Sequence, residues 1–474
     1  MINLNQDTIV APATTPGTGA ISIVRLSGPD CFGIADAVVQ INGAKICESD
    51  GYTIHYGRVY SQDTLLDEVL VSVFRAPHSY TGEDSVEIST HASAYIVREL
   101  TALLLKAGAR FAEPGEFTRR AFLNGKMDLA QAEAVADVIS SSTLASHRVA
   151  MNQLKGVFSQ ELASLRSDLL EMASLLELEL DFSEEEVEFA NREHLLGLVE
   201  KTLRHVEKLS ASFHQGNMIK NGVPVAIVGA ANAGKSTLLN ALLGEDRALV
   251  SDIPGTTRDS IEEVLNLGGI LFRFMDTAGI RHSSDTVEMM GIDRTFRLLS
   301  RAEIVLALVD ITSEERDLLN HLKLLLEKVD FERQQVFILL NKSDLREKSR
   351  ANKNVIDINN FVSLSDYKAK IIEISAKTQK GIEELKEALI KAEQGLIPNA
   401  DSTFVTNARH YEALIETASA LRDVRSSLSE GIPTELVAED LRRAIGGINS
   451  ILGSGLLDPD TILHSIFSKH CIGK

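Results

Sequence analysis

The fold follows from the stretch Val225-Ala-Ile-Val-Gly-Ala-Ala-Asn-Ala-Gly-Lys-Ser-Thr-Leu-Leu-Asn240. It contains Gly229-x-x-x-x-Gly-Lys-Ser236, set between a strand-like apolar segment and a helix-like segment. The two glycines allow a tight turn in which successive N–H groups face phosphate oxygens, and the helix N-terminus adds partial positive charge. Lys235 reaches the β- and γ-phosphates, and the Ser236 hydroxyl can bind Mg²⁺. The stretch therefore predicts a phosphate-binding loop, or P-loop.

Three further motifs each follow a predicted strand, in the order Asp276-Thr-Ala-Gly279, Asn341-Lys-Ser-Asp344 and Ser375-Ala-Lys377. At a strand end, Asp276 is placed to hold the Mg²⁺ shell, and the glycine N–H of the same motif can contact a γ-phosphate. The carboxylate of Asp344 can accept both the N1–H and the N2–H₂ of guanine, a pair of donors that adenine lacks.

The same second motif supplies two more expected contacts. Asn341 can bond the other guanine edge, and the stem of Lys342 can lie along the base. Strands and helices alternate over residues 222–392, as a parallel sheet requires. Because ligands bind at the carboxyl ends of strands in such sheets, four motifs at strand ends predict a P-loop GTPase domain with a mainly parallel sheet.

Length and composition limit the classes of protein to consider. The 474 residues suffice for two or three domains. A net charge of −19 argues against broad non-specific affinity for nucleic acid or anionic membranes. The three cysteines are too few and too scattered for a disulfide framework or a zinc site. With no signal peptide and no apolar run of about 18 residues, we expect a cytoplasmic protein without a membrane partner.

The remaining chain predicts two kinds of structure, which makes the fold class multidomain α/β and α+β. Residues 1–118 predict an α+β domain, with strands near 21–26, 52–60, 68–74 and 85–89 and a helix near 92–106. Residues 119–221 and 393–474 predict helices, near 127–148, 192–213, 408–428 and 434–452. We expect one discontinuous all-helical domain in two halves, with the GTPase domain inserted between them.

Two observations refine these assignments. One apolar helix face recurs at alternating steps of three and four residues, formed by Leu162, Leu165, Leu169, Met172 and Leu176. In the N-terminal part, Arg25 and Glu87 lie on or near predicted strands. From periodicity alone, we interpret them as surface or cross-strand charges.

Several segments outside the general GTPase motifs are more specific. They are Pro114-Gly-Glu-Phe117, Arg120-Ala-Phe-Leu-Asn-Gly-Lys126, Asp128-Leu-Ala-Gln-Ala-Glu133, Gly255-Thr-Thr-Arg-Asp259 and Cys471-Ile-Gly-Lys474. With these segments, essentially the whole sequence resembles the MnmE (TrmE) family of tRNA-modification GTPases.

The resemblance implies an N-terminal tetrahydrofolate-binding domain that also forms a homodimer. It implies an FAD-dependent partner, MnmG, in a heterotetrameric or larger complex. Together the two proteins add a carboxymethylaminomethyl or aminomethyl group at C5 of the wobble uridine (U34) of certain tRNAs. A 5-formyl- or methylene-tetrahydrofolate supplies the one-carbon unit. By position, the family's folate-contacting residues are Arg25, Glu87, Lys126 and Lys474, and its C-terminal cysteine is Cys471.

The hydrolytic residues depart from the Ras-type arrangement. Ras-type enzymes place a glutamine after the Asp-x-x-Gly motif to orient water, whereas Ile280 stands there in this chain, and no arginine finger is evident. The resemblance implies a K⁺ ion instead, brought into place when two GTPase domains meet. A fixed cation beside the phosphates supplies the charge that an arginine would supply.

The resemblance also implies the residues of this site, one by one. The K⁺ ligands match Asn232, Ser251, Ile253 and Thr256, and the Mg²⁺ ligands match Ser236 and Thr257, with Asp276 acting through water. The catalytic residues match Glu288, which orients water, Lys235 and Thr257. Ser251 stands where a threonine is commoner and contributes through its backbone.

The complete predicted nucleotide site joins these residues to the four motifs. It comprises Asn232, Ala233, Gly234, Lys235, Ser236, Thr237, Ser251, Asp252, Ile253, Pro254, Gly255, Thr256, Thr257, Asp276, Thr277, Ala278, Gly279, Asn341, Lys342, Ser343, Asp344, Ser375, Ala376 and Lys377.

Two alternatives compete with this interpretation. A ribosome-assembly GTPase of the Era or Der type shares the P-loop and guanine motifs, but it needs an RNA-binding appendage or a second GTPase domain. The chain has one set of nucleotide motifs, and its acidic balance does not suit a large ribosomal footprint. The second alternative is a non-catalytic folate-binding scaffold with structural GTP, which persistence of bound GTP in potassium buffer would favour.

Overall fold

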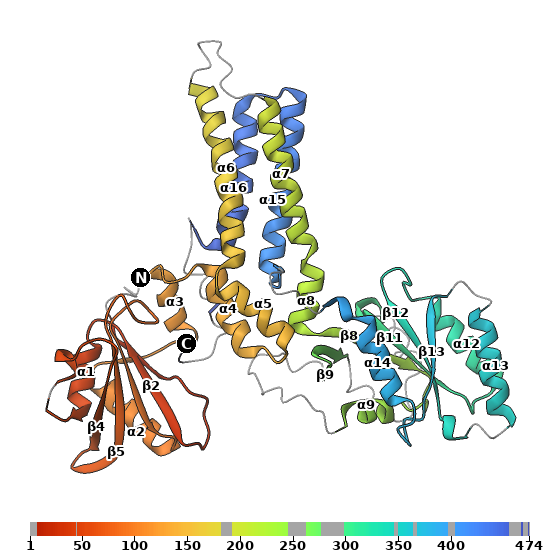
Figure 1. Ribbon diagram of the computed structural model, residues 1–474, viewed down its shortest axis with the longest axis horizontal. Coiled ribbons are helices and arrows are strands. Elements are labelled where there is room, and N and C mark those ends of the chain that lie inside the picture. Colours follow the sequence, from red (N-terminus) through yellow and green to blue (C-terminus); the bar gives the residue numbers. More distant parts are fainter. Residues whose placement is uncertain are drawn as a thin grey trace. The chain divides into compact units, whose positions relative to one another are not determined.

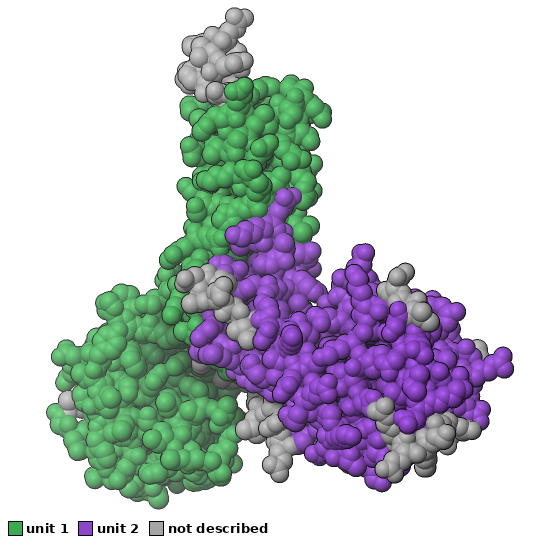
Figure 2. Space-filling view, turned by 45° about the vertical axis from the view of Figure 1, so that its right-hand side comes forward, with its two compact units in different colours: residues 1–140, 150–206, 413–474 green, residues 141–149, 207–412 purple. Residues whose placement is uncertain are grey.

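The computed structural model describes residues 7–43, 45–181, 192–244, 262–275, 298–345, 349–363, 367–396, 403–454, 466–467 and 473. The chain forms two compact units (Figure 2). Unit 1 comprises Met1–Ser140, Ala150–Val206 and Ala413–Lys474, and unit 2 comprises Ser141–Val149 and Glu207–Glu412. The predicted domain boundaries stay predictions.

A seven-stranded sheet begins unit 1, in the order β3-β4-β5-β6-β2-β1-β7. Its strands are β1 (Ile9–Pro12), β2 (Ile21–Ser27), β3 (Val39–Ile41), β4 (Thr53–Ser61), β5 (Thr64–Phe74), β6 (Ser85–His91) and β7 (Arg110–Phe111). All pairings are antiparallel except that of β1 with β7. The four strands predicted here are confirmed, while β1, β3 and β7 are additional.

One face of this sheet carries the N-terminal core (Figure 1). Helices α1 (Cys31–Val38) and α2 (Ala94–Lys106) pack there against alternating side chains such as Val71 and Ile88, both fully buried. Such alternation is what a sheet with one covered face requires. The predicted helix at 92–106 is confirmed as α2.

The helical part of unit 1 uses residues from before and after the six-stranded sheet of unit 2 in sequence. Its helices are α3 (Glu116–Leu123), α4 (Leu129–Ser140), α6 (Val157–Asp181), α7 (Arg192–Ala211), α15 (Ala408–Glu430) and α16 (Thr434–Leu452). Helices α5 (Leu144–Leu154), α7 and α15 each have residues in both units. The predicted apolar face at 162–176 is confirmed, because all five side chains are buried in α6. Helix α16, far away in sequence, packs along α6 (Figure 1).

The helical stretch predicted near residues 127–148 is confirmed, and it consists of two helices. The structure divides it into α4 and α5, with a break after Ser140. Thr143 and Ser146 explain the break, since each side-chain oxygen accepts the backbone N–H of the other. This reciprocal capping starts a new helix and competes with continuation of the first one.

Unit 2 contains a six-stranded sheet in the order β13-β12-β11-β8-β10-β9. The strands are β8 (Val223–Gly229), β9 (Glu263–Leu267), β10 (Ile270–Phe274), β11 (Ile304–Asp310), β12 (Gln335–Asn341) and β13 (Ala369–Glu373). Only β9 runs antiparallel to its neighbour, which confirms the mainly parallel sheet.

Helices cover both faces of this sheet. Helices α9 (Lys235–Leu243) and α14 (Ile382–Ala392) pack on one face, and α12 (Glu315–Leu326) and α13 (Ser349–Ser363) pack on the other. Near-continuous apolar strands fit burial on both sides. Helix α8 (Phe213–Asn221) and the 3₁₀ turns η1 (Ile46–Glu48), η3 (Ser343–Leu345) and η4 (Gln394–Leu396) complete the assigned elements.

The architecture confirms the predicted fold class, which comprises an N-terminal α+β part, a helical part and an inserted α/β part. Among the residues described, none of the helices has both the length and the hydrophobicity of a bilayer-spanning segment.

Candidate functional sites

The P-loop joins the end of β8 to the start of α9, as predicted. Gly234 adopts φ 101° at the N-cap of α9, and a Cβ added there would lie 2.5 Å from Nδ2 of Asn341. A Cβ at Gly229 would lie 2.3 Å from the carbonyl oxygen of Leu308 on the neighbouring β11. Both glycines are therefore needed for close packing as well as for the turn.

The charge expected for phosphate binding lies over this loop. Nζ of Lys235 donates to the carbonyl oxygens of Gly229 and Ala230, at 2.8 and 2.9 Å. Burial of the ammonium group lowers the pKa of Lys235 from its ordinary value. No side-chain hydrogen bond caps the N-terminus of α9, so no capping side chain occupies its first backbone N–H groups. Phosphate oxygens match this set of donors.

Asn341 connects two of the predicted motifs. Its Nδ2 donates to the carbonyl oxygen of Ala233 in the P-loop at 2.7 Å, and the N–H of Ala376 donates to its Oδ1 at 3.0 Å. Sequence reasoning expected only a bond to the base. The structure adds a second role, in which this buried amide holds the phosphate-binding and base-binding loops together.

Asp344, the predicted guanine-binding carboxylate, has a neutral partner. The hydroxyl of Ser375 donates to Oδ1 of Asp344 at 2.6 Å, and Ser375 is fully buried. The same hydroxyl accepts the N–H of Thr378 at 3.2 Å. The loop after β13 therefore orients the carboxylate that follows β12. Ser343 is buried and Lys377 is exposed beside them.

Lys342 is positioned by a residue that the sequence analysis missed. Nζ of Lys342 forms an ion pair with Oδ2 of Asp310 at 2.5 Å. Burial acts to raise the pKa of Asp310, but hydrogen bonds from Lys342 and Thr312 outweigh it and lower that pKa. Asp310 follows a buried apolar strand, the same signal that identified the other strand-end carboxylates.

A second candidate site lies on the open face of the N-terminal sheet. Arg25 and Glu87 are register partners on β2 and β6, and Nε and Nη2 of Arg25 lie 2.9 and 2.7 Å from Oε1 of Glu87. The guanidinium lies 5.3 Å from the ring centre of Tyr80 and 5.7 Å from that of Phe117. The predicted pair thus lies beside two aromatic rings that sequence reasoning did not identify.

The C-terminal end of the chain reaches this second site. The carbonyl oxygen of Gly473 lies 3.5 Å from Nη1 of Arg25. Gly473 adopts φ 95°, and a Cβ there would lie 2.1 Å from the carbonyl oxygen of Pro12. Lys126 is exposed and donates to the carbonyl oxygen of Pro77 at 3.0 Å.

Some predicted site residues lie outside the described part of the chain. They are residues 251–257 and 276–279, Glu288, Cys471 and Lys474. Their roles stay predictions, as do those of Asn232, Ser236 and Thr237, which the structure places in and after the P-loop.

Comparison with known proteins assigns the family. A family model described as GTP-binding protein TrmE N-terminus matches residues 8–126, and one described as MnmE helical domain matches residues 129–471. The tRNA modification GTPase MnmE of Bacteroides thetaiotaomicron is 49% identical over 99% of this chain and 100% of its own length. The chain belongs to the MnmE family. The MnmE protein of Porphyromonas gingivalis is 45% identical, over 100% of this chain and 99% of its own length.

Solved structures outside the MnmE family match a smaller part. The G domain of the T. maritima FeoB iron transporter is 25% identical, covering 36% of this chain and 99% of that one, with a TM-score of 0.26. The MnmE family is therefore assigned from the full-length relatives and the family models.

Proposed function

We propose that this chain hydrolyses GTP in a potassium-dependent reaction coupled to dimerisation of its GTPase domain. With the FAD-dependent partner MnmG, it adds a carboxymethylaminomethyl or aminomethyl group at C5 of U34 in certain tRNAs. A tetrahydrofolate one-carbon unit is consumed in that step. As a member of the MnmE family, the chain is a GTPase of tRNA modification.

One observation carries the nucleotide part of this proposal. The P-loop, Asn341 and the Ser375–Asp344 pair are joined by direct hydrogen bonds into one site at the carboxyl ends of β8, β12 and β13. Lys235 supplies positive charge for the β- and γ-phosphates. Asp344 supplies two acceptor positions for the guanine N1–H and N2–H₂.

The described donors fit the two predicted cations. Ser236 lies in the first turn of α9, where a hydroxyl can bind Mg²⁺ next to the phosphates. Asn232 adopts φ 60° in the exposed part of the P-loop, a left-handed conformation that asparagine tolerates. Its amide oxygen is a hard donor of the kind that K⁺ binds. A bound K⁺ supplies fixed positive charge beside the transferred phosphoryl group.

The Arg25–Glu87 pair supports the folate part. A planar, anionic molecule of the folate class can stack on aromatic rings and pair with a guanidinium. Tyr80, Phe117 and Arg25 offer these contacts on one side of the sheet. The open face also exposes apolar side chains, including Ile54 at 68% and Leu70 at 49%, and such surfaces support the proposed homodimer.

Hydrolysis of GTP in matched potassium and sodium buffers tests the nucleotide mechanism. We expect a large acceleration by potassium that Asn232→Ala removes. Asn221→Ala, an exposed change on α8, is the matched control and retains the acceleration. Equal slow rates in both salts would contradict the cation mechanism and favour a scaffold with structural GTP.

Modification of tRNA tests the remaining part. The chain is incubated with MnmG, GTP, methylene-tetrahydrofolate, glycine or ammonium, and unmodified tRNA, and U34 is analysed by nucleoside mass spectrometry. An aminomethyl-type product that requires both proteins is expected. Absence of such a product, with both proteins folded and GTP hydrolysed, would contradict the assignment.

A further inference from the structure

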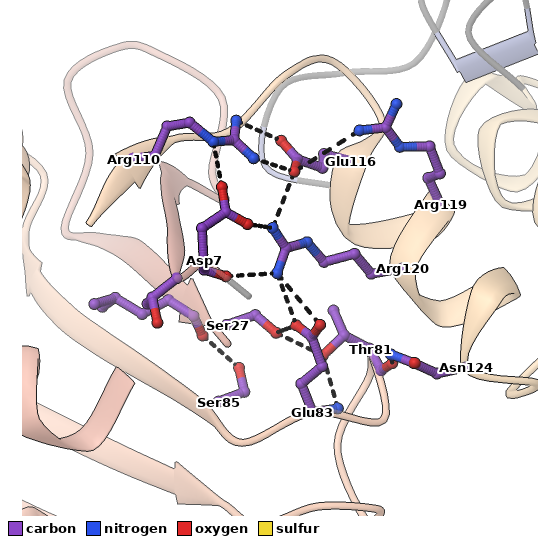
Figure 3. Close-up of polar contacts among 12 residues, drawn as sticks. Asp7, Ser27, Thr81, Glu83, Ser85, Arg110, Glu116, Arg119, Arg120 and Asn124 are labelled. Atoms are coloured by element: carbon purple, nitrogen blue, oxygen red, sulfur yellow. Dashed lines mark hydrogen bonds and ion pairs between the residues drawn. The ribbon is translucent and has the colours of Figure 1, made fainter. Parts of the chain in front are cut away.

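A partly buried group of charges lies at α3 in unit 1 (Figure 3). We name it the Arg120 cluster, and it consists of Asp7, Glu83, Arg110, Glu116, Arg119 and Arg120. The side chain of Arg120 is 1% exposed and that of Glu116 is 0% exposed. Neither residue has a role in the proposed GTP reaction.

Arg120 is the residue that joins the parts of this cluster. Its Nη2 lies 2.6 Å from Oδ1 of Asp7 and 3.1 Å from Oε1 of Glu116. Its Nη1 donates to the carbonyl oxygen of Asp7 at 2.9 Å and lies 3.3 Å from both carboxylate oxygens of Glu83. One guanidinium therefore connects α3 with Asp7, two residues before β1, and with the loop before β6.

Stability alone is a poor explanation for such a group. Removing charges from water has a large free-energy cost, and well-packed apolar side chains are often as stabilising as a buried ion pair. Nε of Arg120 and Nε of Arg119 have no hydrogen-bond partner among the described residues. What directional ion pairs do supply is a fixed geometry, because each guanidinium and carboxylate bonds in defined directions.

The geometry that the cluster fixes is that of residues 79–83, here named the Tyr80 loop. Oε2 of Glu83 accepts the hydroxyl of Ser27 at 2.8 Å, and that hydroxyl lies 2.6 Å from Oγ1 of Thr81. Nδ2 of Asn124, just after α3, donates to the carbonyl oxygen of Thr81 at 2.8 Å. The loop is thus held both from β2 and from α3 (Figure 3).

The Tyr80 loop and α3 form the two walls around Arg25. The hydroxyl of Tyr80 is hydrogen-bonded to Oγ1 of Thr118 at 2.8 Å, and Thr118 is fully buried. The ring of Tyr80 and the ring of Phe117 both face the Arg25 guanidinium. A shift of the loop relative to α3 would therefore move one wall of the second candidate site.

We propose that the Arg120–Glu83 ion pair is a positioning pair for the Arg25 site, which holds Tyr80 against α3 so that the site can bind a folate-class ligand. The inference rests on the proposed function and deepens it, since it assigns the ligand's affinity to a group that does not touch the ligand. Substitutions that do not touch a ligand can still change its affinity about 2- to 30-fold when they lie in a network of contacts connected to its site.

The test measures binding of 5-formyl-tetrahydrofolate to the full chain by titration calorimetry. The variants are Glu83→Gln, which keeps an acceptor for Ser27 but removes the charge, and Arg120→Gln. Arg110→Gln is the matched control, because Arg110 bonds Asp7 and Glu116 on the side of the cluster away from Glu83 (Figure 3). Thermal unfolding and GTP hydrolysis are measured on every variant.

For Glu83→Gln and Arg120→Gln, we expect Kd to rise about 3- to 30-fold, with GTP hydrolysis unchanged. Arg110→Gln lowers the unfolding temperature of unit 1 to a similar extent but changes Kd less than about twofold. If Arg120→Gln fails to fold, Glu83→Gln and Tyr80→Phe, which removes only the hydroxyl bonded to Thr118, carry the test.

Three outcomes would overturn the inference, and they differ from one another. Unchanged Kd in Glu83→Gln, with normal binding by the unsubstituted chain, contradicts the positioning pair alone. A rise in Kd for Arg110→Gln as large as that for Glu83→Gln would mean that the Arg120 cluster only stabilises the fold. No binding by the unsubstituted chain contradicts the folate part of the proposed function, and the inference with it.

Discussion

Two carboxylates at the two candidate sites are held in different ways. Asp344 in the GTPase site accepts a hydrogen bond from the neutral hydroxyl of Ser375, whereas Glu87 on the N-terminal sheet is paired with the Arg25 guanidinium. A hydroxyl orients a carboxylate but leaves its charge uncompensated. A guanidinium orients the carboxylate and also compensates its charge. Recognition of guanine should therefore depend on the charge at Asp344. Ligand binding at the second site should depend on the geometry of the Arg25–Glu87 ion pair.

The largest effect should come from Asp344→Asn. The asparagine amide keeps one acceptor but places its N–H₂ group opposite one of the two guanine donors, so we expect GTP affinity to fall about 100-fold or more. Xanthosine triphosphate should bind this variant better than GTP, because a carbonyl replaces the 2-amino group. Competition with a fluorescent guanine nucleotide measures both affinities. Asp317→Asn, an exposed change on α12, is the control. An equal loss of GTP affinity in Asp317→Asn would mean that GTP binding does not depend specifically on the charge at Asp344.

A smaller effect is expected for Arg25→Gln, which leaves the half-buried Glu87 without its partner. Binding of 5-formyl-tetrahydrofolate should weaken about 30-fold, while potassium-stimulated GTP hydrolysis stays unchanged. The exposed pair of Arg58 with Glu68 on the same sheet provides the control, since both side chains are about half exposed. Arg58→Gln should leave binding unchanged, because exposed ion pairs contribute little. Calorimetry on both variants decides between a general charge effect and a local one.

Ser375→Ala isolates the orientation of Asp344 from its charge. Loss of one hydrogen bond to a carboxylate that is otherwise retained should weaken GTP binding about fivefold, with guanine still preferred over xanthine. Equilibrium binding of GTP and xanthosine triphosphate tests both statements. A loss as large as that in Asp344→Asn would mean that Ser375 acts on the whole loop after β13.

The smallest effect concerns a third carboxylate, Glu393, which lies near another acid. Burial and the nearby Glu303 raise the pKa of Glu393 to about 7. The folded chain therefore binds more protons than the unfolded chain between the ordinary glutamate pKa and pH 7, so this group's contribution to stability falls as pH rises through that window.

Glu393→Gln removes the titrating group and should flatten this pH dependence. At pH 8 the unfolding temperature of unit 2 should rise by about 2–4 °C, as expected for about 1 kcal/mol in a unit of this size. Scanning calorimetry at pH 5 and pH 8 measures the change, and a shift on adding GDP identifies the unit 2 transition. Glu387→Gln, an exposed change on α14, should leave both transitions where they are.

Local sequence signals predicted many of the elements and the position of the P-loop between β8 and α9. The predicted helix at 434–452 coincides with α16, since proline precedes it and a glycine with φ 77° follows it. The P-loop and Asp344 were found because each lies next to its own strand in sequence. The break between α4 and α5 was missed, although the Thr143–Ser146 capping pair is readable in the sequence.

The second site was predicted only through family resemblance. Arg25, Tyr80, Phe117 and Gly473 lie far apart in sequence, and no local pattern brings them together. Their assembly depends on sheet register and on how α3 packs over the open face. The second role of Asn341 was missed for the same reason, because its partners belong to two other loops.

The contact between Gly473 and the first strands has a consequence for protein synthesis. A ribosome completes the motifs of the GTP site before it makes residue 473, and domains generally fold as units while the chain emerges. The Arg25 site is therefore completed after the GTP motifs, although most of its residues are made first. A chain released before residue 473 would carry the GTP motifs and an incomplete second site, so nucleotide binding alone does not show that the second site is complete.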